Sequence, residues 1–158
     1  MAVLAICALL ALGSSLSDFD RYPSRNHFVG FPAPLVSTAK VRKHKTVLEQ
    51  AVRDGANFNG YYRVAWWGCG TNCVEWAVIN LKTGVVWFAA EPALSCFAAA
   101  DNTGSSPHET LETRVSSKLF YLYFCDPPFR GDRTFNMRRV YVWSGSTPQL
   151  IRTERVDK

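Results

Sequence analysis

The stretch that decides the fold reads Asn57-Phe58-Asn59-Gly60-Tyr61-Tyr62-Arg63-Val64-Ala65-Trp66-Trp67-Gly68-Cys69-Gly70-Thr71-Asn72-Cys73. It gathers aromatic residues, three glycines and two cysteines into a short span. Residues 61–67 and 73–81 carry the period of two that is typical of strands, and the glycines allow the backbone to turn sharply between them. The sequence therefore predicts a strand–turn–strand unit at the centre of the domain.

The chain begins with an apolar run at residues 2–13, followed by small and polar residues. The run is too short to cross a bilayer, which needs ~20 residues, but it has the length of a signal-peptide core. No Lys or Arg precedes the run, although signal peptides usually begin with a positive charge. The alternatives to a signal peptide are a buried N-terminal helix and a short membrane anchor. We expect residues 1–17 to be a signal peptide, cleaved after Gly13 or Ser17. The mature chain would be periplasmic or secreted, with no stable membrane span.

Five cysteines are present, and one of them, Cys7, lies inside the predicted signal peptide. The four that remain are Cys69, Cys73, Cys96 and Cys125. An even number in an exported chain indicates two disulfides, for which three pairings exist. We favour 69–73, because the neighbouring glycines permit a tight loop, and 96–125, whose longer loop would contribute ~3–4 kcal/mol in the chain-entropy model.

The composition suits one globular domain without a nucleic-acid partner. A chain of 158 residues falls within the size of a single domain, and a hydrophobic content of 47% is enough for a core. The net charge is +5, but the basic residues are scattered along the sequence. A nucleic-acid-binding protein would show a clustered basic stripe or a recognition motif, and neither is present.

Residues 18–37 contain three prolines and are expected to form an extended arm without regular structure. Phe28, Phe31 and Leu35 alternate with these helix breakers and are expected to pin the arm to the domain surface.

A single helix is expected after the arm. Ser37 or Thr38 can cap its start, and Gly55 stands where a left-handed C-terminal cap belongs. His44 lies between two lysines and is therefore expected on the solvated face of this helix.

Further strands are expected at residues 85–89, 117–125, 136–143 and 149–156, and residues 90–113 are expected to form an irregular excursion. With the helix, these elements predict a single disulfide-stapled domain over residues 38–158. Its expected class is α+β: a mostly antiparallel sheet of about six strands, with one N-terminal helix packed on it.

The cysteine pair of the hairpin could be a metal site, a redox pair, a nucleophile or a structural disulfide. A metal site needs four ligands, and no second Cys or His pair stands nearby, so we expect no metal and no cofactor. Redox pairs use Cys-x-x-Cys at a helix N-terminus, which is one residue shorter than the spacing of Cys69 and Cys73. A cysteine nucleophile needs a histidine base, and nothing places His27, His44 or His108 beside it. The pattern favours a structural staple.

Acidic and aromatic residues give weaker signals. Glu75 alternates with apolar neighbours and is expected on the polar face of its strand, while Glu91, Glu109 and Glu112 fall in the excursion and single out no catalytic pair. Ten Trp and Tyr residues fall on predicted strands. They are expected to pack across the strands beneath the helix and arm, and any that are exposed would offer a platform for glycan or protein surfaces.

The chain carries three linked motifs: Asn57-Phe58-x-Gly60-x-Tyr62, Trp67-Gly68-Cys69-Gly70-Thr71-x-Cys73 and Val78-Ile79-x-x-x-Thr83-Gly84-x-Val86. They resemble those of a family of small exported bacterial proteins of unknown function, over roughly residues 45–125. The resemblance implies export, a short helix before the first motif and a later Ser-x-Leu strand, here Ser117-Lys118-Leu119. The chain departs from the family at Tyr61, where a histidine is frequent, and at Asn80, where an aspartate is frequent. The resemblance implies no reaction.

The leading prediction is a non-enzymatic binding domain, exported and associated with the cell envelope, with an envelope protein or a glycan as its partner. Two alternatives stay open. One is a small envelope hydrolase that uses Cys69 or Glu75 with a histidine supplied by the fold, and the other is an inhibitor or immunity-type partner of a specific enzyme. The candidate binding turn consists of Trp67, Gly68, Gly70, Thr71, Asn72 and Glu75.

Overall fold

The structure is a computed structural model, and it describes residues 17–70, 73–90, 92–94, 111–124 and 137–156. The predicted signal peptide lies outside these ranges apart from Ser17. The elements, in chain order, are α1 (Asp18–Arg21), α2 (Ala39–Lys43), α3 (Lys45–Arg53), β1 (Tyr62–Gly70), β2 (Cys73–Asn80), β3 (Val86–Phe88), β4 (Ala93–Leu94), β5 (Leu111–Thr113), β6 (Leu119–Phe124), β7 (Met137–Trp143) and β8 (Pro148–Arg155).

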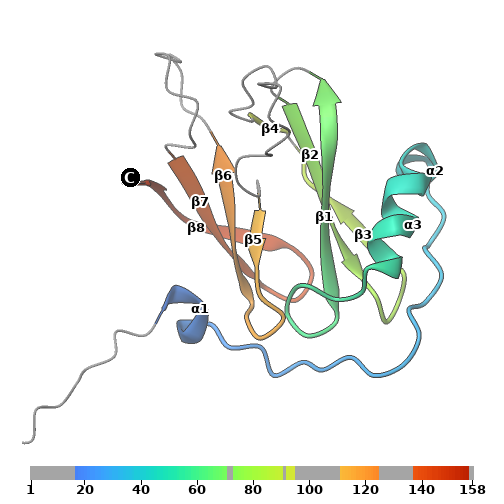
Figure 1. Cartoon of the computed structure of the whole chain (residues 1–158), viewed down its shortest axis with the longest axis horizontal. Coiled ribbons are helices and arrows are strands. Elements are labelled where there is room, and N and C mark those ends of the chain that lie inside the picture. The colour runs from blue at the N-terminus through green and yellow to red at the C-terminus, as the bar shows by residue number, and fades with distance from the viewer. Residues whose placement is uncertain (1–16, 71–72, 91, 95–110, 125–136, 157–158) are drawn as a thin grey trace, which may run out of the picture.

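The described strands form two antiparallel sheets (Figure 1). The first has the order β1-β2-β3, with β4 also paired to β2, and the second has the order β5-β6-β7-β8. The α+β class is confirmed, but the prediction of one sheet with about six strands is wrong. Apolar residues occur on both faces of the first sheet because α2 and α3 cover one face and the second sheet covers the other. Strands β4 and β5 lie inside the predicted irregular excursion.

The core between the two sheets is aromatic. Phe58 and Trp76 from the first half of the chain meet Phe120 and Trp143 from the second sheet. The ring centroids of Phe58 and Phe120 lie 5.3 Å apart and those of Trp76 and Phe120 lie 5.4 Å apart, both edge to face. Such pairs contribute ~0.5–1.5 kcal/mol beyond the burial of their area. The strand aromatics therefore pack between two sheets, and only part of them lie beneath the helices.

Two helices, α2 and α3, stand where one was expected. Thr38 caps the first of them, since its side chain accepts a hydrogen bond from the N–H of Val41 at 3.1 Å. The backbone leaves helical geometry at His44, where φ is −110°, and α3 begins at the next residue. Gly55 follows α3 with a φ of +79°, the left-handed conformation that its position predicted.

The N-terminal arm, residues 18–37, is held along the domain by its backbone. It begins with α1, although no regular structure was expected there. Further along, the N–H of Ala33 donates to the carbonyl oxygen of Leu81 at 2.8 Å. A Cβ atom on Gly84 would lie 1.8 Å from the carbonyl oxygen of Pro34. The arm and the β2–β3 turn can therefore touch only because that residue is a glycine.

Three apolar side chains were expected to pin the arm. Phe28 and Leu35 pack against the cluster formed by α2, α3 and the first sheet. The prediction for Phe31 is wrong, because this side chain is 98% exposed.

The turn before β1 joins separate parts of the chain. The side chain of Asn57 accepts a hydrogen bond from the N–H of Val64 at 2.8 Å and donates to its carbonyl oxygen at 3.0 Å. The side-chain oxygen of the buried Asn59 accepts from the Ser24 hydroxyl at 2.7 Å and from the Asn26 amide at 3.0 Å. The Asn-Phe-x-Gly motif thus ties the arm to the first strand.

A charged network joins α1 to the second sheet. Arg152 donates to Asp18 and to Glu154, and Arg138 donates to the second oxygen of Glu154 at 2.5 Å. The Tyr121 hydroxyl also donates to Asp18, at 3.1 Å. Burial opposes ionisation of Asp18, but the hydrogen bonds from Arg152 and Tyr121 outweigh it and lower the pKa of this carboxyl. The hydrogen bond from Arg152 is the main reason that the pKa of Glu154 is lowered too.

Candidate functional site

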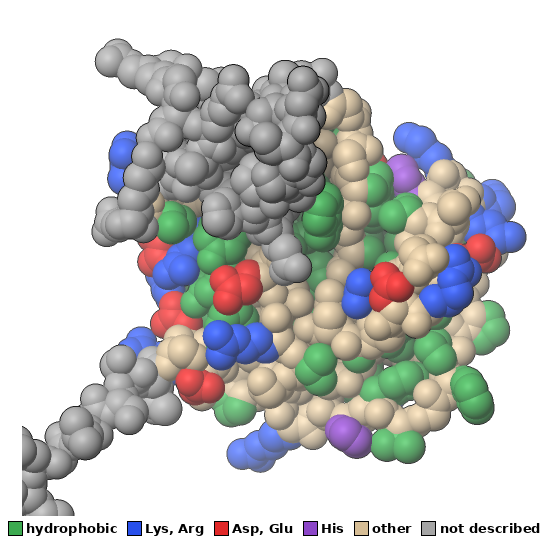
Figure 2. Space-filling model, viewed as in Figure 1, with side chains coloured by type: hydrophobic (Ala, Val, Ile, Leu, Met, Phe, Trp, Pro, Cys, Tyr) green, Lys and Arg blue, Asp and Glu red, His purple; other side chains and the backbone are tan. Residues whose placement is uncertain are grey.

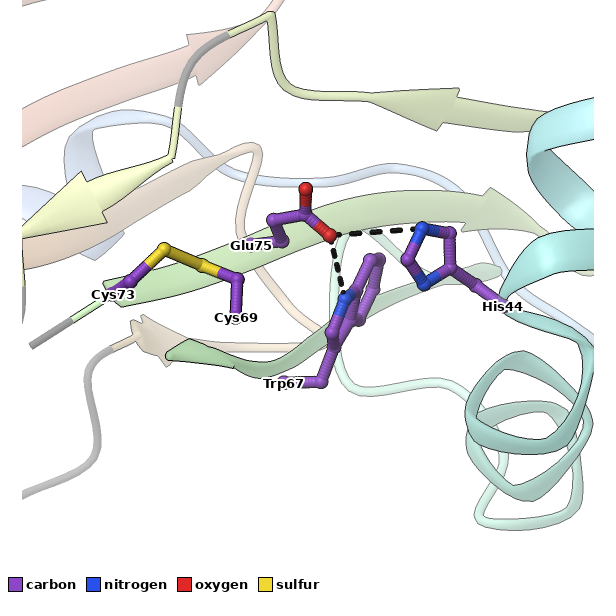
Figure 3. Close-up of a disulfide and its surroundings, with 5 residues drawn as sticks. All are labelled: His44, Trp67, Cys69, Cys73 and Glu75. Carbon is purple, nitrogen blue, oxygen red and sulfur yellow. Dashed lines mark hydrogen bonds and ion pairs between the residues drawn. A yellow bond between two sulfur atoms is a disulfide. The ribbon is translucent and has the colours of Figure 1, made fainter. Parts of the chain in front are cut away.

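The end of the β1–β2 hairpin carries the predicted binding turn, and a cross-strand pair lies at its base (Figure 3). Trp67 and Glu75 are directly opposite each other in the antiparallel register. The indole Nε1 of Trp67 donates a hydrogen bond to Oε2 of Glu75 at 2.9 Å. Glu75 was expected to face solvent, but its side chain is 32% exposed and holds the indole in one orientation. This pair therefore fixes β1 against β2.

His44 lies against this pair, and the prediction that it is solvated is wrong. Its ring packs against the ring of Trp67 at a tilt of 37°, with centroids 4.8 Å apart, and its Nε2 lies 3.6 Å from Oε2 of Glu75. The side chain is only 12% exposed. Its Nε2 is buried and has no hydrogen-bond partner among the described residues. His44 lies three residues after Val41 and four before Leu48, so helical spacing places it on the same face as these two buried residues.

A disulfide between Cys69 and Cys73 closes the hairpin, with Cα atoms 5.1 Å apart. Figure 3 shows Glu75 between this disulfide and His44. A bonded sulfur offers no thiolate, so the disulfide form of Cys69 is not a nucleophile. Cys96 and Cys125 lie outside the described residues, and their pairing stays a prediction.

One edge of β1 is open beyond its first residues. Among the described strands, β1 pairs only with β2. On the other edge, Tyr62 exchanges backbone hydrogen bonds with Phe58 at 2.9 and 3.0 Å, and the side chain of Asn57 occupies both backbone groups of Val64. Backbone groups alternate in direction along a strand, so those of Trp66 and the residue two beyond it point to the same edge. No described residue pairs with them there.

Gly68 stands on this open edge, and the described fold does not require a glycine at that position. Its φ is not positive, and a Cβ atom built on it would meet nothing within 4 Å. Gly70, by contrast, has a φ of +136°, which favours glycine. A glycine inside a strand weakens it and often marks a bulge or a close approach of a ligand or another backbone, and the β1–β2 register shifts between Gly68 and Gly70.

A cavity of about 220 Å³ adjoins the open edge, between α3, β1 and β5. Trp66, which is 38% exposed, lies at this cavity together with Thr113 from β5. Arg63 lines it as well and donates to Asp54 at 3.0 Å, while its Nε is buried without a hydrogen-bond partner in the described part of the chain. The cavity combines an aromatic wall with polar groups, as a recognition site for one side chain does.

The described residues offer little support for catalysis. Glu75 and His44 lie within 4 Å of each other, but neither lines a described cavity. Glu112 accepts a hydrogen bond from the Tyr123 hydroxyl at 2.8 Å on the second sheet, and Glu91 and Glu109 lie outside the described residues. In the ranges that the structure describes, no group of three or more His, Cys, Asp or Glu side chains could hold a metal ion.

Of the predicted binding turn, the structure places Trp67, Gly68, Gly70 and Glu75 at one end of the hairpin, whereas Thr71 and Asn72 lie outside the described residues. Sequence reasoning missed His44, Trp66 and Asn57. The sequence signal for the open edge was Gly68 itself, a glycine within a run of strand-forming residues. The role of Asn57 had no comparable signal, because its contact with β1 depends on the turn between them.

The comparisons with known proteins are negative: no protein-family model, curated protein or solved structure matches this chain. Among the helices that the structure describes, none has the length and apolar character needed to cross a membrane.

Proposed function

We propose that this chain is an exported, non-enzymatic domain that binds an extended polypeptide segment of an envelope or secreted partner. The segment adds as a strand to the open edge of β1, beside Trp66 and Gly68. Strand addition of this kind uses backbone hydrogen bonds for affinity and side-chain pockets for specificity. Export rests on the signal-like N-terminus and is supported by the disulfide within the hairpin.

The proposal rests on the backbone pairing along the edge of β1 that faces away from β2. Its first two outward-facing positions are occupied within the chain, by Phe58 and by the side chain of Asn57. Pairing stops at the position where Trp66 becomes exposed and Gly68 removes the Cβ atom. A strand added here would meet N–H and C=O groups that pair with no described residue, and Gly68 would present no side chain on either face of the sheet.

The edge is held rigid before any partner arrives. The Cys69–Cys73 disulfide and the Trp67–Glu75 hydrogen bond both tie β1 to β2 on its other side. A pre-formed edge reduces the conformational entropy that binding must overcome. This gives the Trp-Gly-Cys motif a role in binding without requiring any of its residues to react.

Backbone hydrogen bonds alone would give weak binding, since each contributes about 0.5–1.5 kcal/mol net. The cavity of about 220 Å³ supplies the remainder, because one side chain of the added strand can enter it beside Trp66. An inhibitor that blocks a specific enzyme could use the same edge. A hydrolase is less well supported, because Cys69 is bonded in the disulfide.

The test selects binders of the oxidised full chain from a random peptide display library and maps them by amide hydrogen exchange. We expect selected peptides to slow exchange of the Trp66 and Gly68 amides, and Gly68→Val to weaken binding by about tenfold or more. The control Thr153→Val changes an exposed residue on another edge strand, β8, and should leave binding unchanged. The proposal fails if the peptides protect other amides instead, if no peptide is selected, or if this edge is occupied by a second copy of the chain.

A further inference from the structure

The arm and the β2–β3 turn, which are hydrogen-bonded to each other, both expose large apolar side chains. Val29 is 83% exposed, Phe31 98%, Val36 47% and Val85 53%. The N–H of Val36 donates to the carbonyl oxygen of Gly84 at 2.9 Å, which brings the arm to the turn that carries Val85. Single exposed apolar residues are common, but a group of them marks an interaction surface. We call these four residues the apolar rim.

Basic residues gather next to the apolar rim. Residues 38–54, which contain α2 and α3, hold five basic residues against two acidic ones, although the sequence alone suggested scattered charges. Glu49 is paired with Lys45 at 3.7 Å and Asp54 with Arg63 at 3.0 Å. Figure 2 shows Lys and Arg side chains over the side of the molecule that carries these helices, with hydrophobic side chains below them.

A groove of about 750 Å³ lies between the arm and the helices, because the arm forms one of its walls and α2–α3 the other. Pro32, Pro34 and Leu35 contribute from the arm, and Arg42, Lys45 and Arg53 from the helices. The basic side chains and the arm therefore belong to one continuous surface. The hydrogen bond between Ala33 and Leu81, at 2.8 Å, holds the arm against the domain. The arm residues of the apolar rim are therefore attached to an ordered backbone.

We propose that this surface docks on an anionic lipid bilayer, with Phe31 and Val29 entering the interfacial region and the basic residues of α2–α3 above the headgroups. Burial of apolar area and attraction to anionic lipids act together in such binding. Each Lys or Arg near an anionic surface adds to the attraction, and the effect decreases with salt.

The shape of the surface favours a bilayer over an acidic peptide. A peptide would occupy the concave groove, and its contacts would cover Val41 and Val52 on the groove wall. The most exposed apolar side chain, Phe31, does not line that groove and is almost completely open to solvent. Protruding apolar residues next to basic ones match a deformable bilayer, and a groove ligand would leave them uncovered. This inference does not rest on strand addition at β1.

The experiment measures co-sedimentation of the full chain with vesicles. One set contains equal amounts of phosphatidylglycerol and phosphatidylcholine, and the other contains phosphatidylcholine alone. We expect binding to the anionic vesicles only, weakened by added salt. The double variant Val29→Ser/Phe31→Ser should lower the affinity by about tenfold or more, since two apolar side chains no longer enter the interface. The matched control Leu150→Ser/Ile151→Ser changes two half-exposed apolar residues on β8 and should bind as wild type.

Two charge-reversal variants distinguish the effect of the basic residues on α2–α3 from the effect of net charge. Arg42→Glu/Lys43→Glu should reduce binding strongly, while Arg21→Glu/Lys118→Glu makes the same change of net charge away from the helices and should reduce it much less. The proposal is overturned if the chain does not sediment with anionic vesicles, or if the arm variant binds as wild type. A polyglutamate peptide provides a further test. The proposal is also overturned if this peptide prevents sedimentation of the chain with vesicles and binds the arm variant as tightly as the wild type.

Discussion

The indole of Trp67 and the carboxylate of Glu75 form a 2.9 Å hydrogen bond across the β1–β2 register, next to the disulfide. The sequence placed both residues in the candidate binding turn but did not predict a hydrogen bond between them. Charged acceptors make stronger hydrogen bonds than neutral ones, so this contact contributes more than an average side-chain bond. It lies on the edge strand that we propose binds a partner.

We expect Trp67→Phe to lower the free energy of unfolding by about 1.5–3 kcal/mol, because the ring contact with His44 is retained while Glu75 loses a donor. Urea unfolding followed by circular dichroism measures the change. Glu75→Gln keeps an acceptor in place and serves as the control, with a smaller loss expected. Equal losses in the two variants would contradict the assigned hydrogen bond.

His44 provides a test of whether this cluster is structural or chemical. Its buried Nε2 lacks a partner among the described residues, and its ring packs on Trp67. Replacing a poorly paired polar group by an apolar one of similar shape is nearly neutral or stabilising. We expect His44→Phe to leave the unfolding free energy unchanged or to raise it, as read from thermal unfolding. A marked loss of stability would show that its 3.6 Å contact with Glu75 matters more than its packing.

The glycines of the two motifs should separate into structural and functional ones. A Cβ atom on Gly60 would lie 2.2 Å from the carbonyl oxygen of Asn26, and φ at this glycine is +78°. We expect Gly60→Ala to cost roughly 1–3 kcal/mol of stability. Gly68→Ala meets no such contact and should change stability by less than about 0.5 kcal/mol. Chemical denaturation of both variants in parallel is the measurement, and a large loss for Gly68→Ala would remove the argument that its glycine serves a partner.

The sequence anticipated local features of the fold better than its layers. The cap at Thr38, the left-handed Gly55 and the β1–β2 hairpin follow from residue type and spacing over a few positions, which is why they were predictable. The division into two sheets was not, because strand periodicity states which residues alternate and not which surface covers them. Both a helix and a second sheet can cover an apolar face, and here each covers one.

The candidate site shows the same division. Gly68 and the cysteines were visible as a motif, but the open edge of β1 depends on where pairing with Phe58 and Asn57 ends. That end point is a property of the turn and of three-dimensional register. His44 was misplaced for a different reason: the two lysines beside it indicated a solvated face, whereas its spacing from Val41 and Leu48 places it on the buried face.

The Cys69–Cys73 disulfide should contribute modestly to stability. It closes a loop of sequence separation 4, and the chain-entropy model gives ~2 kcal/mol for so short a loop. We expect Cys69→Ser/Cys73→Ser to lower the urea midpoint while the circular dichroism spectrum stays the same. Peptide binding at the β1 edge should fall by more than the stability loss explains, because the edge is no longer braced. Unchanged binding by the double variant would mean that the disulfide does not support the edge.

The second sheet should lose stability at high pH through two tyrosines. Burial, reinforced by a hydrogen bond to Asp18, raises the pKa of Tyr121 to about 12, and burial with a hydrogen bond to Glu112 raises that of Tyr123 to about 12. The unfolded value is ~10, so the fold favours the neutral phenols. Their contribution is therefore fully present below pH ~10 and is lost as the pH rises through about 12.

Unfolding free energies measured by urea titration between pH 8 and 12 test this expectation. Stability should fall across the upper part of that range, and phenolate absorbance should appear later in the folded chain than in the unfolded one. The variant Tyr121→Phe/Tyr123→Phe should be less stable at neutral pH, because it lacks the bonds to Asp18 and Glu112, and its stability should fall less steeply with pH. An alkaline limb of the same slope in the variant and the wild type would assign the loss to other groups.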